Sequence, residues 1–124
     1  MYDSSKAYKN KYYFGFIYSS FNLYDFKAAL VKSPVSARVQ ADQDVFQFYS
    51  KGVISLGCGT DLNHDVLVAG YQKVGLLEAF IVKNSWGTDW GQDGYTYINT
   101  DYHINNGVGA CGILWDAEAP FIMD

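Results

Sequence analysis

The stretch KNSWGTDWGQDGY, residues 83–95, decides how this chain is interpreted. It places two tryptophans and three glycines within thirteen residues, which core packing alone explains poorly. An apolar run, Leu76 to Asn84, leads into it, and Tyr95 to Ile98 follows it. Runs of this length and composition predict strands. The stretch between them is therefore predicted to be a glycine-rich loop joining two strands.

A second apolar run lies upstream, from His64 to Tyr71, and Val74-Gly75 marks the turn that follows it. Strands joined by a tight turn pair antiparallel. We therefore expect the imidazole of His64 and the carboxamide of Asn84 to meet on adjacent strands.

One helix is predicted near the start of the chain. Asn22 is a capping residue with Asp25 three positions on, as in a capping box, and Pro34 ends the helix near Ser33. The apolar positions of the helix recur at helical spacing at Leu23, Phe26 and Leu30.

The rest of the chain is rich in strand and turn signals. Residues 35–39 alternate between apolar and polar, which predicts a half-buried strand. The other expected features are a weakly alternating β-prone run at Tyr12 to Tyr18, a helical turn at Asp44 to Ser50, a loop at Gly52 to Asp61 and a turn at Asn105-Asn106-Gly107. One main helix followed by several antiparallel strands indicates an α+β fold with a small β-barrel.

Composition sets the broad class. The chain has 124 residues, which predicts one domain over 1–124, and 49% of them are hydrophobic, enough for a packed core. Its net charge of −4 and the lack of a basic stripe argue against nucleic acid as a partner. No run is long and apolar enough to predict membrane insertion. The polar, tyrosine-rich segment Met1 to Lys11 is not predicted to be a signal peptide.

Taken together, LNHDV at 62–66, KNSWG at 83–87, and the later WG at 90–91 and GY at 94–95 resemble the papain-like cysteine peptidases, the C1 family that includes the cathepsins. The motifs GCG at 57–59, ACGI at 110–113 and SPVS at 33–36 resemble the same family. The resemblance runs from about Phe21 to Phe121. It implies the C-terminal, right-hand β-barrel half of a papain-like fold, which is incomplete without the cysteine-bearing helical half.

The resemblance also implies roles for three side chains. In such peptidases a cysteine thiolate attacks the carbonyl, a histidine acts as general acid and base, and an asparagine orients the imidazole. His64 and Asn84 match the last two roles. Trp86 would shield their hydrogen bond from water. No cofactor and no metal site are expected.

The nucleophile is the missing part. Its signature, C-G-[SA]-C-[WY], should lie about 130–150 residues before the histidine, which is upstream of Met1. From the residues alone, Cys58 and Cys111 are compatible with a disulfide, with two core residues, or with one nucleophile and a bystander. The resemblance implies that they form a disulfide. His103, the other histidine, is expected to lie in a polar turn without a partner.

Three charged residues match family positions that line the pocket for the substrate residue two before the cut. Arg38 and Asp65 stand where small or apolar residues are usual, and Asp116 stands where an acidic residue accepts a basic substrate side chain. Arg38 could instead pair with either carboxylate and fill the pocket. These three charges are equally compatible with a solvated rim.

Two functions follow, beside the third possibility of a truncated or degraded fragment with no separate function. The chain is either the His/Asn half of a peptidase, inactive by itself and completed by an upstream half that binds the peptide substrate with it, or a pseudoenzyme-like module for binding or assembly. Either function requires a partner over the apolar face that the missing half would cover. The resemblance implies a lysosomal, vacuolar or secreted location.

Overall fold

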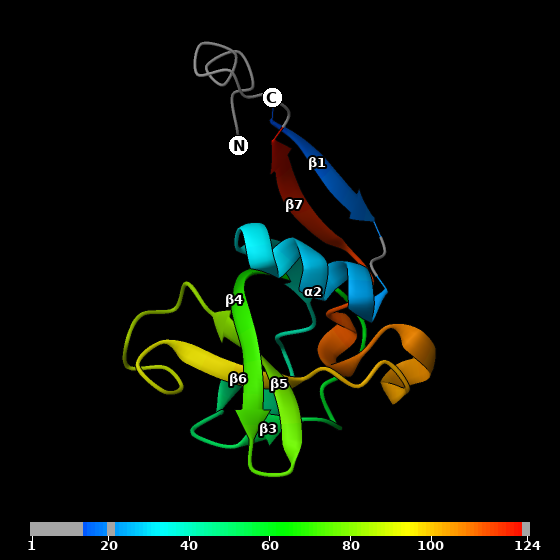
Figure 1. Cartoon of the computed structure of the whole chain (residues 1–124). Coiled ribbons are helices and arrows are strands. Elements are labelled where there is room, and N and C mark those ends of the chain that lie inside the picture. Colours follow the sequence, from blue (N-terminus) through cyan, green and yellow to red (C-terminus); the bar gives the residue numbers. More distant parts are fainter. Residues whose placement is uncertain (1–13, 20–21, 123–124) are drawn as a thin grey trace.

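The structure, a computed structural model of the chain, describes residues 14–19 and 22–122. The segment Met1 to Lys11 and the first residues of the predicted β-prone run lie outside them. A curled seven-stranded sheet carries one main helix on its surface (Figure 1). The elements are β1 Phe14–Ser19, α2 Leu23–Lys32, β2 Val35–Val39, α3 Asp44–Gln47, β3 Val53–Ile54, β4 His64–Val74, β5 Leu77–Lys83, β6 Tyr95–Asn99, the 3-10 turns η1 Ile104–Gly107 and η2 Ala110–Gly112, and β7 Ala117–Ile122.

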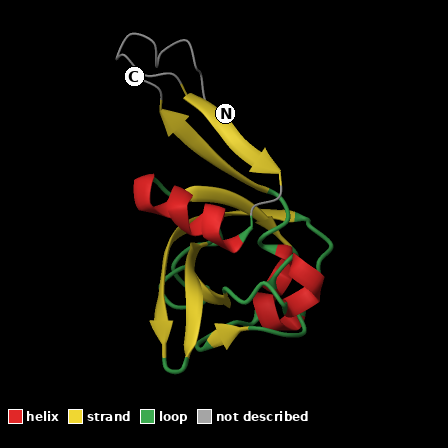
Figure 2. Cartoon of the chain, turned by 45° about the vertical axis from the view of Figure 1, so that its right-hand side comes forward, coloured by secondary structure: helices red, strands yellow, loops and turns green. Residues whose placement is uncertain are grey.

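The strands follow the order β1-β7-β2-β4-β5-β6-β3. Every pair is antiparallel except β3 with β6, which is parallel. β1 and β7 form a two-stranded arm that projects from the rest of the sheet (Figure 2). The expected α+β fold with a largely antiparallel sheet is confirmed. The short strand β3 was expected to be loop, because two residues carry too little pattern to be recognised.

Helix α2 begins where the sequence predicts. The side-chain oxygen of Asn22 accepts a hydrogen bond from the backbone N–H of Asp25 at 2.8 Å, and this satisfies one of the free donors of the first turn. Phe26 is fully buried, and its ring packs on that of Phe80 in β5 at 4.7 Å between centroids. The helix is thereby fixed across the sheet.

A charged contact fastens the same helix at its edge. Lys27 Nζ lies 2.6 Å from Glu78 Oε1 and 4.8 Å from the centre of the Tyr71 ring. The hydroxyl of Thr100 donates to the same Glu78 oxygen at 2.9 Å. The hydrogen bond from Lys27 is the main reason that the pKa of Glu78 is lowered. The carboxylate of Glu78 in β5 therefore links α2 to the residue that follows β6.

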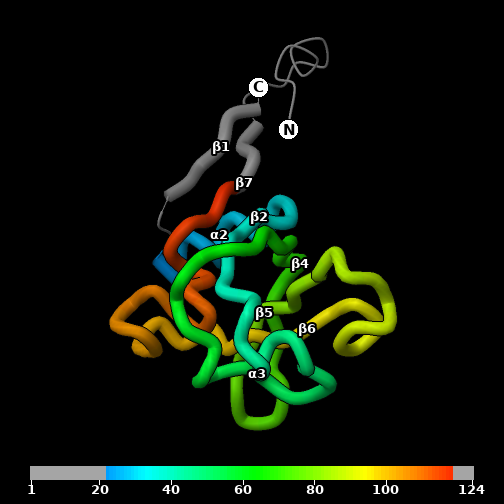
Figure 3. The backbone as a smooth tube through the Cα atoms, turned by 180° about the vertical axis from the view of Figure 1, so that it is seen from behind, coloured from blue at the N-terminus to red at the C-terminus, as the bar shows by residue number. Residues whose placement is uncertain are grey.

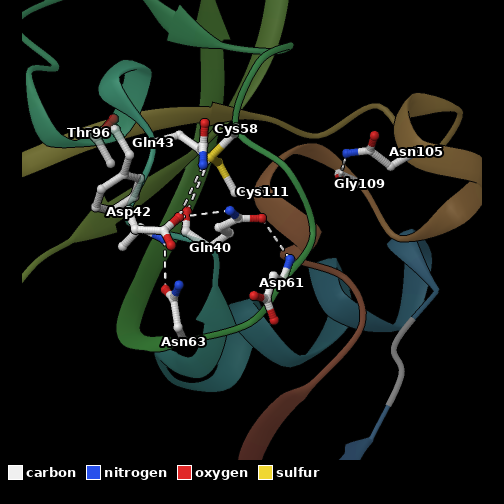
Figure 4. Close-up of a disulfide and its surroundings, with 12 residues drawn as sticks. Gln40, Asp42, Gln43, Cys58, Asp61, Asn63, Thr96, Asn105, Gly109 and Cys111 are labelled. Atoms are coloured by element: carbon white, nitrogen blue, oxygen red, sulfur yellow. Dashed lines mark hydrogen bonds between the residues drawn. A yellow bond between two sulfur atoms is a disulfide. The ribbon is translucent and has the colours of Figure 1, made fainter.

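The predicted disulfide is confirmed. Cys58 and Cys111, both almost fully buried, are joined across a separation of 53 residues. The backbone N–H of Gln40 donates to the carbonyl of Cys111 at 2.9 Å, and its side-chain oxygen accepts from the N–H of Asp61 at 2.7 Å (Figure 4). Cys58 Sγ lies 3.2 Å from the Gln40 carbonyl oxygen, a contact without a thiol hydrogen.

This network reaches the residue before His64. The side-chain N–H of Gln40 donates to Asp42 at 2.7 Å, and it is the main reason that the pKa of Asp42 is lowered. The N–H of Ala41 donates to the side-chain oxygen of Asn63 at 2.9 Å. The disulfide and the amides around it therefore hold the chain that leads into β4.

Loss of the disulfide should destabilise the chain strongly. Closing a loop of 53 residues is worth about 4 kcal/mol in the chain-entropy estimate. We expect Cys58→Ala/Cys111→Ala to lower the free energy of unfolding by about this amount in a urea titration. Reducing the wild-type protein should give the same shift, and the reductant should not affect the variant. Equal stability of variant and oxidised wild type would contradict this assignment.

The Lys27–Glu78 contact predicts a pH dependence. A carboxyl with a lowered pKa in the folded state stabilises the fold above its unfolded pKa, about 4.3, and this stabilisation is lost as the pH falls below that value. We expect Glu78→Gln to cost up to about 1 kcal/mol at pH 7. The difference from wild type should shrink between about pH 4.5 and pH 3 in urea titrations. Asp89→Asn, an exposed control, should change nothing; a gap that is constant with pH argues against the contact.

Candidate active site

His64 and Asn84 lie side by side at one end of the β4–β5 pair. His64 begins β4, Asn84 follows the last residue of β5, and the two strands pair antiparallel. His64 Nε2 is 2.7 Å from Asn84 Oδ1. Asn84 is only 5% exposed, whereas the imidazole is partly exposed. The meeting of these two side chains, predicted from the sequence, is present in the structure.

The backbone fixes the proton on this imidazole. The N–H of Ser85 donates to Asn84 Oδ1 at 2.7 Å, so the atom that faces His64 is the amide oxygen, which only accepts. His64 must therefore donate from Nε2, and Nδ1 is the nitrogen left without a proton in the neutral ring. Among the described residues, Asn84 Nδ2 is buried without a partner.

An aromatic group, made up of Phe46 and Trp86, lies beside the imidazole of His64. The Trp86 ring lies 5.0 Å from that of His64 between centroids, tilted by 38°. Phe46 is fully buried and packs edge-on against Trp86 at 5.5 Å. Trp86 keeps 42% of its surface exposed. One side of the His64–Asn84 pair therefore borders aromatic rings rather than water, which is the geometry that the shielding role of Trp86 requires.

Trp90 connects the glycine-rich loop of the motif at residues 83–95 to α3. Its indole N–H lies 3.1 Å from the carbonyl oxygens of both Phe46 and Gln47. These carbonyls lie at the end of α3, where the last carbonyl groups of a helix lack N–H donors from within the helix. Figure 3 shows the segment that carries α3 from behind. Trp90 therefore does more than pack against its aromatic neighbours, because its N–H also satisfies this helix end.

The turn in the motif needs two left-handed residues. Gln92 and Tyr95 exchange backbone hydrogen bonds, and Asp93 and Gly94 between them have φ of 55° and 91°. Positive φ at both central residues is the type I′ geometry that Asp-Gly favours. Gly91 precedes the turn, and a Cβ there would lie 2.5 Å from the Tyr95 carbonyl oxygen. Gly91 and Gly94 therefore serve the close turn that follows Trp90.

Arg38, Asp65 and Asp116, the three charged residues named from the resemblance, also come together. Arg38 Nε is 3.4 Å from Asp65 Oδ1, and Arg38 Nη1 is 3.8 Å from Asp116 Oδ2. Arg38 and Asp65 are directly opposite on β2 and β4. Arg38 was expected to pair with one carboxylate or the other; in the structure it contacts both.

His103 is a correction. It was expected to have no partner, but its Nδ1 lies 2.9 Å from Asp101 Oδ1, and its backbone N–H donates to the same oxygen at 2.8 Å. Both bonds lower the pKa of Asp101, and the bond from the backbone N–H of His103 is the larger cause. The expectation failed because an Asp two residues away is near in a turn but looks unremarkable in sequence.

The described residues offer neither a metal site nor a membrane-spanning helix. No cluster of three or more His, Cys, Asp or Glu in this part of the chain could hold a metal ion. No helix within residues 14–19 and 22–122 is long and apolar enough to cross a membrane.

A sequence profile of the papain family cysteine proteases matches residues 2–121. The chain belongs to the papain family of cysteine proteases. It is 42% identical over 92 residues to the KDEL-tailed cysteine endopeptidase CEP2 of Arabidopsis thaliana and 45% identical over 93 residues to cysteine endopeptidase Rep1 of Oryza sativa subsp. japonica. Each match covers 74% of this chain and 25% or 24% of the relative. The chain thus spans about a quarter of their length.

Solved structures agree with the family assignment. The bromelain protease from Ananas comosus, solved with the E64 inhibitor, is 37% identical to this papain family chain with a TM-score of 0.74, covering 83% of this chain and 48% of that one. The ragweed pollen allergen Amb a 11, solved in its proform, is 30% identical with a TM-score of 0.80, covering 89% and 30%. The predicted C-terminal half of a papain-like fold is confirmed.

The hydrogen-bond geometry predicts opposite tautomers for the two histidines. At alkaline pH, where imidazoles are neutral, His64 should carry its proton on Nε2, which faces an amide oxygen. His103 should carry it on Nδ1, which faces a carboxylate. Two-bond 1H–15N correlation spectra distinguish the two forms.

Asn84→Ala should move His64 towards a tautomer mixture and leave His103 unchanged. Asp101→Asn is the matched control, because it should affect His103 alone. A proton on Nδ1 of His64 in the wild type would refute the orientation assigned to Asn84, and a proton on Nε2 of His103 would refute its contact with Asp101.

Proposed function

We propose that this chain supplies the histidine and asparagine of a Cys-His-Asn peptidase site, and that the attacking cysteine comes from polypeptide outside these 124 residues. The observation that carries the proposal is the 2.7 Å contact between His64 Nε2 and Asn84 Oδ1 beside the Trp86 ring. Both cysteines of the sequence are joined in a disulfide. Neither is free to act as a thiolate, so peptide cleavage requires another segment.

The tautomer assigns the chemistry to atoms. With Nε2 held by Asn84, Nδ1 is the nitrogen available to take the proton of an incoming thiol. The thiolate would then attack the carbonyl carbon of a peptide bond and form a thioester as the C–N bond breaks. The imidazolium returns its proton to the leaving amine, and water hydrolyses the thioester. Asn84 acts as a positioning residue because it holds the ring in the required orientation.

The substrate side of the proposal involves Arg38, Asp65 and Asp116. These residues would line the pocket for the substrate residue two before the cut. The carboxylate of Asp116, with 38% of its side chain exposed, favours a basic side chain there.

A second candidate is a non-catalytic module that uses the same fold for binding or assembly with a partner. Its specific support is the charged cluster at Arg38, because two charged residues replace the small or apolar ones expected there. A buried disulfide such as Cys58–Cys111 is typical of proteins from oxidising compartments. We therefore propose a lysosomal, vacuolar or secreted location, in keeping with its family.

The test uses the protein purified from its source under native conditions, together with whatever polypeptide accompanies it. We expect biotinylated E-64 to label a cysteine outside these 124 residues. In the same complex, His64→Ala should lower kcat/KM on a fluorogenic peptide by about 10²- to 10⁴-fold. His103→Ala, the matched control, should have no effect.

Three outcomes distinguish the candidates. Labelling of Cys58 or Cys111 would refute the assignment of the nucleophile. Hydrolysis that survives His64→Ala would refute the role of the histidine. A stable complex that neither reacts with E-64 nor cleaves peptides would favour the non-catalytic module.

A further inference from the structure

Arg38 is held by several independent contacts, one from its backbone and three from its side chain. Its backbone N–H donates to the carbonyl of Asp116 at 3.0 Å, which places these residues side by side. The guanidinium points each of its three nitrogens at a different acceptor, because Nη2 also lies 3.4 Å from the Leu62 carbonyl. Asp65 stands opposite on β4 and is the residue after His64. A charged cluster thus borders the candidate site.

The cluster is not electrically balanced. Two carboxylates and one guanidinium leave one net negative charge. Arg38 uses one oxygen of each carboxylate, Asp65 Oδ1 and Asp116 Oδ2. No bond to the other oxygens of these two carboxylates is found among the described residues. The contacts of 3.4 and 3.8 Å are longer than a close ion pair, and the side chains are 47%, 78% and 38% exposed. A second cation can approach, but it meets a site that Arg38 already partly neutralises.

We infer that Arg38 is a built-in competitor for the basic side chain of a ligand. It occupies the carboxylates that such a side chain would use, and so it limits how strongly the pocket prefers arginine or lysine over a neutral residue. The inference rests on the proposed function in one respect: it takes Arg38, Asp65 and Asp116 as the lining of a substrate pocket. It concerns binding alone, so it stands or falls without catalysis.

Removing the guanidinium should release that preference. Without it the cluster carries two negative charges, and one unit charge a few ångströms from a partly exposed cation changes its affinity by about tenfold or more. Asp116 should carry most of the gain, because it is less exposed than Asp65 and therefore less screened.

The test measures binding to the full 124-residue chain by 1H–15N NMR at low ionic strength. The two probes are Nα-acetyl-argininamide and its neutral isostere Nα-acetyl-citrullinamide, and the backbone amides of Asp65 and Asp116 report binding. We expect Arg38→Gln to raise the preference for the arginine probe about tenfold over wild type. Arg38→Ala should do the same, which guards against a variant that misfolds.

A second substitution identifies the carboxylate. Asp116→Asn in the Arg38→Gln background should remove most of the gain, whereas Asp89→Asn in that background should preserve it. An equal preference in wild type and Arg38→Gln, including no response from either, would overturn the inference. Because no cleavage is measured, an inactive complex in the E-64 experiment would leave this result intact.

Discussion

The antiparallel pairing of β4 with β5 is the constraint on which the candidate site depends. It brings the first residue of one strand beside the residue that follows the other, so His64 and Asn84 meet although 20 residues separate them. Strand pairing fixes which residues face each other, and a slip by one residue would turn the imidazole to the other face of the sheet. The core that holds this register includes Val66, Val68 and Val82, all buried.

Two further groups hold the ends of these strands in place. At the entry to β4, the disulfide and Gln40 fix residues 39–41, and Ala41 in turn bonds to Asn63. At the exit from β5, the N–H of Asn84 donates to the Gly94 carbonyl, and Trp90 bonds to the end of α3. The imidazole and the carboxamide therefore have little freedom to separate. Buried polar networks of this kind favour one arrangement because a broken bond would leave a polar group unpaired.

His64 and its neighbour Asp65 lie on opposite faces of β4 and have different surroundings. Along β4 the residues alternate, so His64 and Val66 lie on the core side while Asp65 lies on the outer side with Arg38. The histidine site is thus bordered by aromatic rings and buried strands, and the charged cluster by solvent. This separation lets one strand carry both a positioned imidazole and a charged surface. Such a surface can change its charge without disturbing the packing beneath the histidine.

The sequence by itself determined the local structure and the family. The cap at Asn22, the alternation of residues 35–39 and the motif at 83–95 each depend on neighbours in the chain, so they are visible without coordinates. Only the tertiary structure decided which acceptor His103 uses, that Arg38 contacts two carboxylates rather than one, that β3 pairs parallel to β6, and that Trp90 completes a helix end 44 residues away. Most of these are contacts between distant residues, and all depend on the exact path of the backbone, which no local pattern of polarity or spacing encodes.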